Sequence, residues 1–165
     1  MLLQLFLAGA LTAIDAVADY PVTEAAGRYK LGQLAFSVDD TYGIRVWRYV
    51  YNNSGSSIAA NLGVMQENGT DFCQVSLSTT GIAAQRIYGV TAHAIPDLSC
   101  GWVVCDGLVY AASDGSTTAD TPQKPAASGQ FTDGVVGTDS IVGHALETEN
   151  PAGAAGLFRM LVRFL

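Results

Sequence analysis

The sequence CGWVVCDGLVY, at residues 100–110, shows the pattern that decides the fold of the last eighty residues. It is a short run of β-branched and aromatic residues that contains a glycine turn signal. Similar segments surround it: RIYGV at 86–90, FTDGVV at 131–136, IVGHALE at 141–147 and LFRMLVRFL at 157–165. Short strands separated by turn residues predict an all-β domain, a small antiparallel sandwich or barrel. They indicate a binding surface more than an active site.

The final segment, residues 157–165, predicts which residues lie in the core. Successive side chains of a strand point to opposite faces. One face carries Phe158, Met160, Val162 and Phe164, and we expect it to be buried. The other face carries Leu157, Arg159, Leu161, Arg163 and Leu165.

The first half of the chain contains one strong strand, RVWRYVY at 45–51. Its aromatic residues Trp47, Tyr49 and Tyr51 share a face, so they serve either the core or a contact with another subunit. Residues 27–36 read as an extended lead-in, and residues 72–77 read as a further strand.

Turn signals divide the second half. Asp106-Gly107, Asp114-Gly115 and Asp133-Gly134 each predict a hairpin turn, because Asp-Gly is a strong hairpin signal. A calcium loop would need acidic residues at alternate positions and a closing Glu, and none of these pairs has them. Residues 112–129, ASDGSTTADTPQKPAASG, are the longest polar stretch and predict an exposed loop.

Composition excludes several classes of function. Hydrophobic residues make up 49% of the 165 residues and charged residues 14%, which excludes disorder for the chain as a whole. The net charge is −7, and the 8 Lys and Arg residues are scattered. Nucleic-acid binding needs clustered positive charge, so we expect no nucleic-acid partner.

Cysteines and histidines give no framework for a disulfide or a metal. Cys100 and Cys105 are five residues apart on one expected strand, roughly 16 Å apart. A disulfide needs Cα atoms within about 7 Å, so we expect these two and Cys73 to be buried thiols. His93 and His144 have no zinc-ligand spacing to the cysteines, and we expect them to be ordinary strand residues, one of them hydrogen-bonded in the core. No metal and no cofactor is predicted.

No set of residues predicts catalysis. The chain has neither a Gly-x-Ser-x-Gly elbow nor a phosphate-binding glycine loop. Asp39 and Asp40 point in opposite directions on a strand, and Glu147 and Glu149 stand at a strand end where carboxylates are usually solvated. Cys105 is next to Asp106, which disfavours a reactive thiolate. The sequence therefore predicts a protein that is not an enzyme.

The apolar beginning, MLLQLFLAGALTAIDAV at residues 1–17, has three interpretations. A cleaved signal peptide would end near Ala18, but no basic residue follows Met1. A membrane helix needs about 20 apolar residues and basic flanks, so no membrane is predicted. The preferred interpretation is an arm, residues 1–26, attached to a β-rich domain, residues 27–165. Leu3, Leu7, Leu11 and Ile14 share a helical face, and together with Leu5 and Phe6 they make an apolar surface that predicts a contact in an assembly.

The order of these features resembles the small capsid decoration, or cement, proteins of tailed bacteriophages. The residues that carry the resemblance are Arg48-Tyr49-Val50-Tyr51, Ile95-Pro96-Asp97, Gly101-Trp102-Val103-Val104, Val142-Gly143-His144-Ala145-Leu146-Glu147 and Leu161-Val162-Arg163-Phe164-Leu165. It covers about residues 30–165, in short glycine-driven motifs. It implies a homo-oligomer, often a trimer, on the outer surface of an icosahedral virion, where it bridges copies of the major capsid protein. It implies no catalytic residues.

Two functions follow as hypotheses. The first is a structural virion protein that decorates the capsid, with contacts through the arm and through Trp47, Tyr49 and Tyr51. The second is a secreted or periplasmic β-sandwich that binds a carbohydrate or a cell surface. In that case Trp47 and Trp102 would be the first residues to stack on a ligand.

Overall fold

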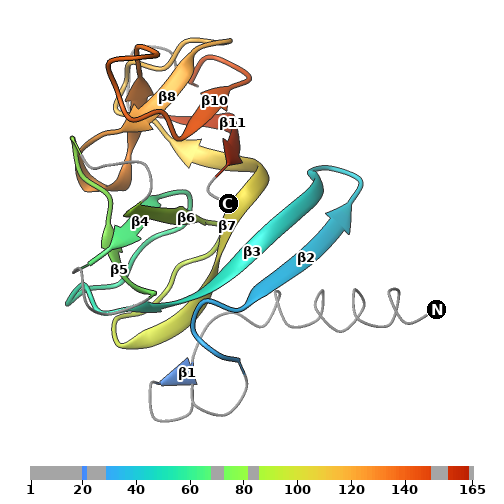
Figure 1. Ribbon diagram of the computed structural model, residues 1–165, viewed down its shortest axis with the longest axis vertical. Helices are drawn as coiled ribbons and strands as arrows, with labels where there is room; N and C mark the ends of the chain where they lie inside the picture. The colour runs from blue at the N-terminus through green and yellow to red at the C-terminus, as the bar shows by residue number, and fades with distance from the viewer. Residues whose placement is uncertain (1–19, 22–28, 68–72, 82–85, 150–155, 164–165) are drawn as a thin grey trace.

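The computed structural model describes residues 20–21, 29–67, 73–81, 86–149 and 156–163. These residues form strands, turns and a short 3-10 helix, η2 (Ala127–Gly129), so the predicted all-β fold is confirmed (Figure 1). No described helix is long and apolar enough to cross a membrane. The strands are β1 (Tyr20–Pro21), β2 (Leu34–Asp39), β3 (Gly43–Asn52), β4 (Gly63–Gln66), β5 (Gln74–Leu77), β6 (Ile87–Thr91), β7 (Ser99–Ala112), β8 (Pro122–Pro125), β9 (Phe131–Asp133), β10 (Gly143–Ala145) and β11 (Leu157–Arg163).

Five of the strands form a closed ring. They pair in the order β3-β5-β4-β6-β7, and β7 pairs back to β3. All of these pairs are antiparallel except β3 with β5. One apolar cluster contains buried residues from the ring strands and from the segments between them: Val50, Ile58, Val64, Cys73, Val75, Tyr88, Ile95 and Val103. The ring is the barrel that the sequence pattern predicts as one of two architectures.

Strand β7 joins this ring to a second group of strands. Its first half pairs with β3, from Tyr51 opposite Cys100 to Val46 opposite Asp106. Its second half pairs with β11, from Arg163 opposite Asp106 to Leu157 opposite Ala112. Beyond β11 the sheet continues through β10, β8 and β9, and these strands lie above the ring in Figure 1.

The predicted hairpin turn at Asp106-Gly107 is wrong, because both residues lie inside β7. The β3–β7 register shifts here, and the thiol of Cys105 donates to the carbonyl of Val46 (3.4 Å). Gly107 has φ +110, and a Cβ there would lie 2.5 Å from the carbonyl oxygen of Ile44. Glycine here permits a bulge in which two backbones approach closely within a strand. The Asp-Gly pair can therefore mark a bulge as well as a hairpin turn.

The polar stretch 112–129 is also different from the exposed loop that was predicted. It contains β8 and η2, and the side chains of Ser113, Thr117 and Gln123 are buried. Thr117 donates to Ser113 (2.9 Å), and Gln123 Nε2 donates to Asp133 Oδ1 (2.8 Å). Buried polar groups are tolerated when they are hydrogen-bonded, so polarity alone does not place a segment at the surface.

The main core lies where β3, β7 and β11 pack. Phe158, Met160 and Val162 of β11 are fully buried, as the alternation predicts, while Leu157, Arg159, Leu161 and Arg163 are exposed. Phe164 and Leu165 lie outside the described residues. Strand β11 therefore has one face in the core and one face in solvent.

Candidate interaction surface

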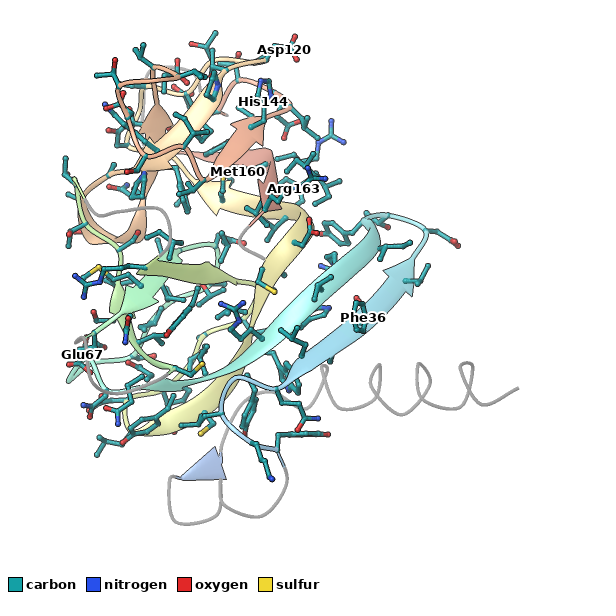
Figure 2. The ribbon with its side chains drawn as sticks, in the orientation of Figure 1. Phe36, Glu67, Asp120, His144, Met160 and Arg163 are labelled. Atoms are coloured by element: carbon teal, nitrogen blue, oxygen red, sulfur yellow. The ribbon has the colours of Figure 1, made fainter. Side chains whose placement is uncertain are left out.

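Strands β2 and β3 form a hairpin that extends to one side of the ring (Figure 1). The exposed face of this hairpin is apolar. Leu34, Phe36 and Val38 of β2 are 40%, 46% and 53% exposed, and Ile44 of β3 is 67% exposed. Val38 is opposite Ile44 in the register, and Phe36 is labelled on this hairpin in Figure 2. We call these four residues the apolar ribbon.

The opposite face of the hairpin is buried, which fixes the orientation of the apolar ribbon. Ala35 and Ser37 are 6% and 2% exposed. The indole of Trp47 donates a hydrogen bond of 2.8 Å to the hydroxyl of Ser37. A one-residue shift of β2 would bury Leu34, Phe36 and Val38 and expose Ala35 and Ser37, so this hydrogen bond helps to set the register.

The hairpin tip is held against β7. The rings of Tyr42 and Tyr110 meet edge to face with centroids 6.3 Å apart. The guanidinium of Arg45 lies 4.2 Å from the centroid of Tyr42 and 4.7 Å from that of Trp47. These contacts hold the hairpin in one position, so the apolar ribbon is a pre-organised surface.

Strand β2 is an edge strand. It pairs with β3, and no other described strand pairs with it. Tyr49 N–H donates to Gln33 O (2.9 Å), and hydrogen-bonded and non-hydrogen-bonded pairs alternate in an antiparallel ladder. The backbone groups of Leu34, Phe36 and Val38 therefore point away from β3. The residues with exposed apolar side chains are the same residues that offer an open backbone edge.

The aromatic residues predicted as contacts lie in or near the core. Trp47 and Tyr49 are 1% and 2% exposed, and Tyr51 is half-buried. Tyr49 packs on Trp102 with centroids 5.0 Å apart, and Tyr29 meets both rings. The core interpretation of this face is confirmed for Trp47 and Tyr49. A contact role for the three residues stays a prediction.

The other predicted contacts belong to the arm at the start of the chain. Leu3, Leu5, Phe6, Leu7, Leu11 and Ile14 lie outside the described residues. Sequence reasoning also missed the apolar ribbon, because it treated residues 27–36 as a lead-in. The signal was present: Leu34, Phe36 and Val38 alternate with Ala35 and Ser37 over five residues, which is the period of a strand.

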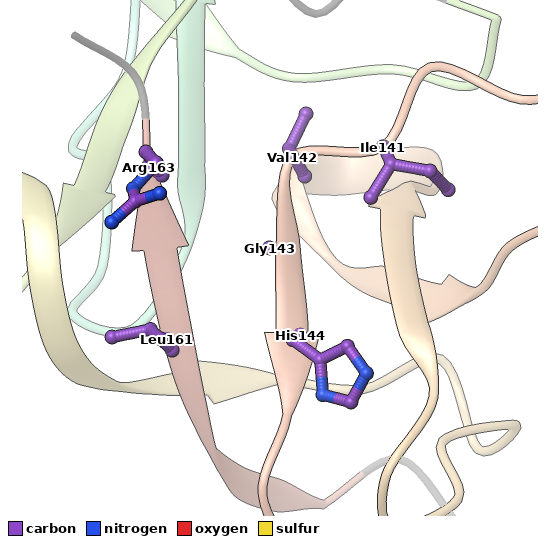
Figure 3. Close-up of a pocket in the computed structure, with 6 residues that line it drawn as sticks. All are labelled: Ile141, Val142, Gly143, His144, Leu161 and Arg163. Atoms are coloured by element: carbon purple, nitrogen blue, oxygen red, sulfur yellow. The ribbon is translucent and has the colours of Figure 1, made fainter. Parts of the chain in front are cut away.

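A second partly apolar surface lies on β10 and β11. An open depression of about 420 Å³ is lined by Ile141, Val142, Gly143, His144, Leu161 and Arg163 (Figure 3). His144 and Arg163 are the ionisable residues of this lining, and both are exposed. Nearby, Arg159 Nε forms an ion pair of 2.8 Å with Glu147. The depression is therefore open to solvent and is lined in part by ionisable side chains.

The cysteines, the histidines and Glu149 differ in how far they are buried. Burial raises the pKa of Cys73 and of Cys105 to about 11, which keeps both as unreactive thiols. Cys100 is buried too, and all three are free, as predicted. The prediction of a core histidine is wrong, since His93 and His144 are both exposed. Glu149, expected in solvent, is 4% exposed, because the chain after β10 folds back to Thr117.

Asp133 shows how the second group of strands is held. Burial opposes its ionisation, but hydrogen bonds from the hydroxyl of Thr121, the N–H of Thr118 and the amide of Gln123 outweigh burial and lower its pKa. Among the described residues, no three His, Cys, Asp or Glu side chains gather as metal ligands would.

No family model matches the chain, and no curated protein matches it. Its structure is similar to a solved structure described as the head fiber gp8.5 N base in bacteriophage phi29, with a TM-score of 0.53 and 11% sequence identity. The likeness covers 73% of this chain and 95% of that one. Similarity at this identity carries the fold and not the activity. The chain therefore shares its fold with the base of a phage head fibre.

Proposed function

We propose that this chain is a structural protein of a phage virion, and that it decorates the outer surface of an icosahedral capsid by bridging subunits of the major capsid protein. The observation that carries the proposal is the fold shared with nearly the whole of a head fibre base. The decoration role is supported by the resemblance in residues 30–165 and by the apolar ribbon on a rigid hairpin.

The mechanism would be linkage. A protein that binds the assembled shell and not free capsid subunits stabilises the shell by mass action. Many weak contacts repeated on a lattice add up to tight attachment. We propose that the chain also associates with itself, as the trimer that the resemblance implies, because closed symmetry lets one patch meet equivalent lattice sites.

We propose no catalytic role for the chain. Two of the described carboxylates have structural partners: Glu147 is paired with Arg159, and Asp139 accepts from Val135 N–H (2.8 Å) and from Lys124 (3.1 Å). The carbohydrate-binding alternative has less support, since Trp47 and Trp102 are each 1% exposed and present no ring to a ligand.

The test is to purify native particles and locate the protein on them. We expect it by mass spectrometry in the particle fraction, with image density outside the shell at positions repeated over every facet. Particles made without it should release DNA at a lower temperature than complete particles. Density only at sparse fibre positions would overturn the decoration role, and absence of the protein from particles would overturn the virion assignment.

A further inference from the structure

We propose that the edge of β2 is a contact between two copies of this chain, in which the β2 strands pair antiparallel across a two-fold axis at Phe36. This inference rests on the proposed self-association and names the surface that performs it. In a protein that forms trimers, such a contact would join one trimer to the next.

The backbone geometry suits this partner. The N–H and C=O groups of Leu34, Phe36 and Val38 point away from β3, as the ladder alternation requires. An exposed row of such groups is a template for another strand. In an antiparallel partner centred at Phe36, the N–H of each of these three residues would donate to a C=O of the second copy and its C=O would accept in return, because a two-fold contact places the same patch on both sides.

The side chains are complementary to themselves in this register. Leu34 would face Val38 of the second copy, and the two Phe36 rings would meet at the axis. Residues 34–38 carry no charge, so no like charges would meet across it. The apolar residues of both copies would then lie side by side on one sheet face, and cross-strand contacts would remove part of the water contact of side chains that are 40% to 53% exposed.

The area of this contact predicts its strength. The exposed area of these three side chains is at most roughly 300 Å² per copy, whereas a stable complex buries about 800 Å² per partner. Pairing should therefore be weak in dilute solution. It should become strong where copies are held close together, since a lattice raises their effective concentration.

The first experiment traps the contact by oxidation of the full chain carrying Phe36→Cys. The Cα atoms of a hydrogen-bonded antiparallel pair are about 5.5 Å apart, within the range of a disulfide. The chain's own thiols are buried and should not compete. The matched control is Ile44→Cys, which is more exposed but lies on β3 opposite Val38. Three strand spacings across the sheet and four residues along it would separate the two copies of residue 44 by roughly 20 Å.

We expect mild oxidation to convert Phe36→Cys to a covalent dimer about tenfold faster than Ile44→Cys, because pairing raises the local thiol concentration. Equal rates in the two variants would overturn the contact. So would a covalent bond from residue 36 to another protein in oxidised particles, and so would failure of a maleimide to label residue 36 in the monomer, which would show that another segment covers it.

A second measurement keeps Phe36 in place. Sedimentation of the unaltered chain at rising concentration should show dimers, and Phe36→Lys should abolish them while Ile44→Lys reduces them less. Equal loss in both variants would mean unspecific apolar association and would overturn the pairing. If the protein is found on particles but residue 36 never cross-links there, the pairing fails and the virion assignment stands. If dimers that depend on Phe36 form in solution but the protein is absent from particles, the pairing stands and the virion assignment fails.

Discussion

Strands β2 and β11 have the same alternation and opposite surroundings. In β11 the buried residues Phe158, Met160 and Val162 alternate with exposed ones, and the strand pairs with β7 on one side and β10 on the other. In β2 the buried residues alternate with Leu34, Phe36 and Val38, and one edge is open among the described residues. The two strands differ in charge and in pairing, not in pattern.

The exposed face of β11 carries Arg159 and Arg163 between its leucines, and Arg159 is tied to Glu147. Charged residues on an exposed strand face prevent unwanted association. The exposed face of β2 has no such protection between residues 34 and 38. The comparison indicates that β11 is a structural strand with both edges paired, and that β2 has the side chains of a surface that binds another molecule. Three pairs of variants test it.

The largest difference should appear between two phenylalanines. Phe158→Ala removes a fully buried ring of β11 and should lower the free energy of unfolding by about 3–5 kcal/mol. Phe36→Ala removes a ring that is 46% exposed and should change that free energy by less than about 1 kcal/mol. Urea unfolding at low protein concentration measures both. Similar losses would mean that β2 belongs to the core as much as β11 does.

The joint between the two regions should be sensitive to one methyl group. Gly107→Ala would place a Cβ 2.5 Å from the carbonyl oxygen of Ile44, in a residue with φ +110. We expect a loss of about 1–3 kcal/mol from strain and displacement of β3. Gly55→Ala is the matched control: its φ is +78, but no atom lies within 4 Å of the new Cβ. Thermal melting should show the smaller loss for Gly55→Ala, and equal losses would mean that the close approach does not matter.

The smallest expected effect is a local loss of stability at acid pH, in the strands beside Asp133 and not in the β2–β3 hairpin. The pKa of Asp133 is lowered in the folded state, so its contribution is present above its unfolded pKa of about 4 and is lost as pH falls through the folded value. Hydrogen-exchange protection, measured relative to intrinsic exchange at the same pH, should therefore fall more in β8 and β9 than in β2 and β3 at pH 3. Asp133→Asn should give the same local loss already at neutral pH, because the amide resembles the protonated carboxyl, whereas Asp120→Asn at an exposed turn should not. An equal loss of hydrogen-exchange protection in all strands would contradict the local role of Asp133.

The sequence was informative where one rule acts alone. The parity of residues 157–163 predicts the core face of β11, since alternation follows directly from strand geometry. The three thiols were predicted as buried because Cys is a small apolar residue. The strand 45–51 was predicted inside the observed β3, whose bounds extend further at both ends.

Prediction failed where tertiary contacts choose between two local outcomes. Asp106-Gly107 can form a turn or a bulge, and the approach of Ile44 to β7 selects the bulge. Residues 112–129 look like a solvated loop until Gln123 and Thr117 find buried partners. The alternation of residues 34–38 does predict a strand, but no local signal says that this strand lies at an edge, because its position depends on the pairing of β3 with β7.

The length of β7 determines how the molecule would carry force. The ring and the second group of strands are both hydrogen-bonded to these 14 residues, with β3 and β11 laid along its two halves. A pull applied along β7 would load the hydrogen bonds of each half in shear, so many of them would have to break together. A molecule stretched between two anchoring points would therefore behave as a tether and would not peel open from one end.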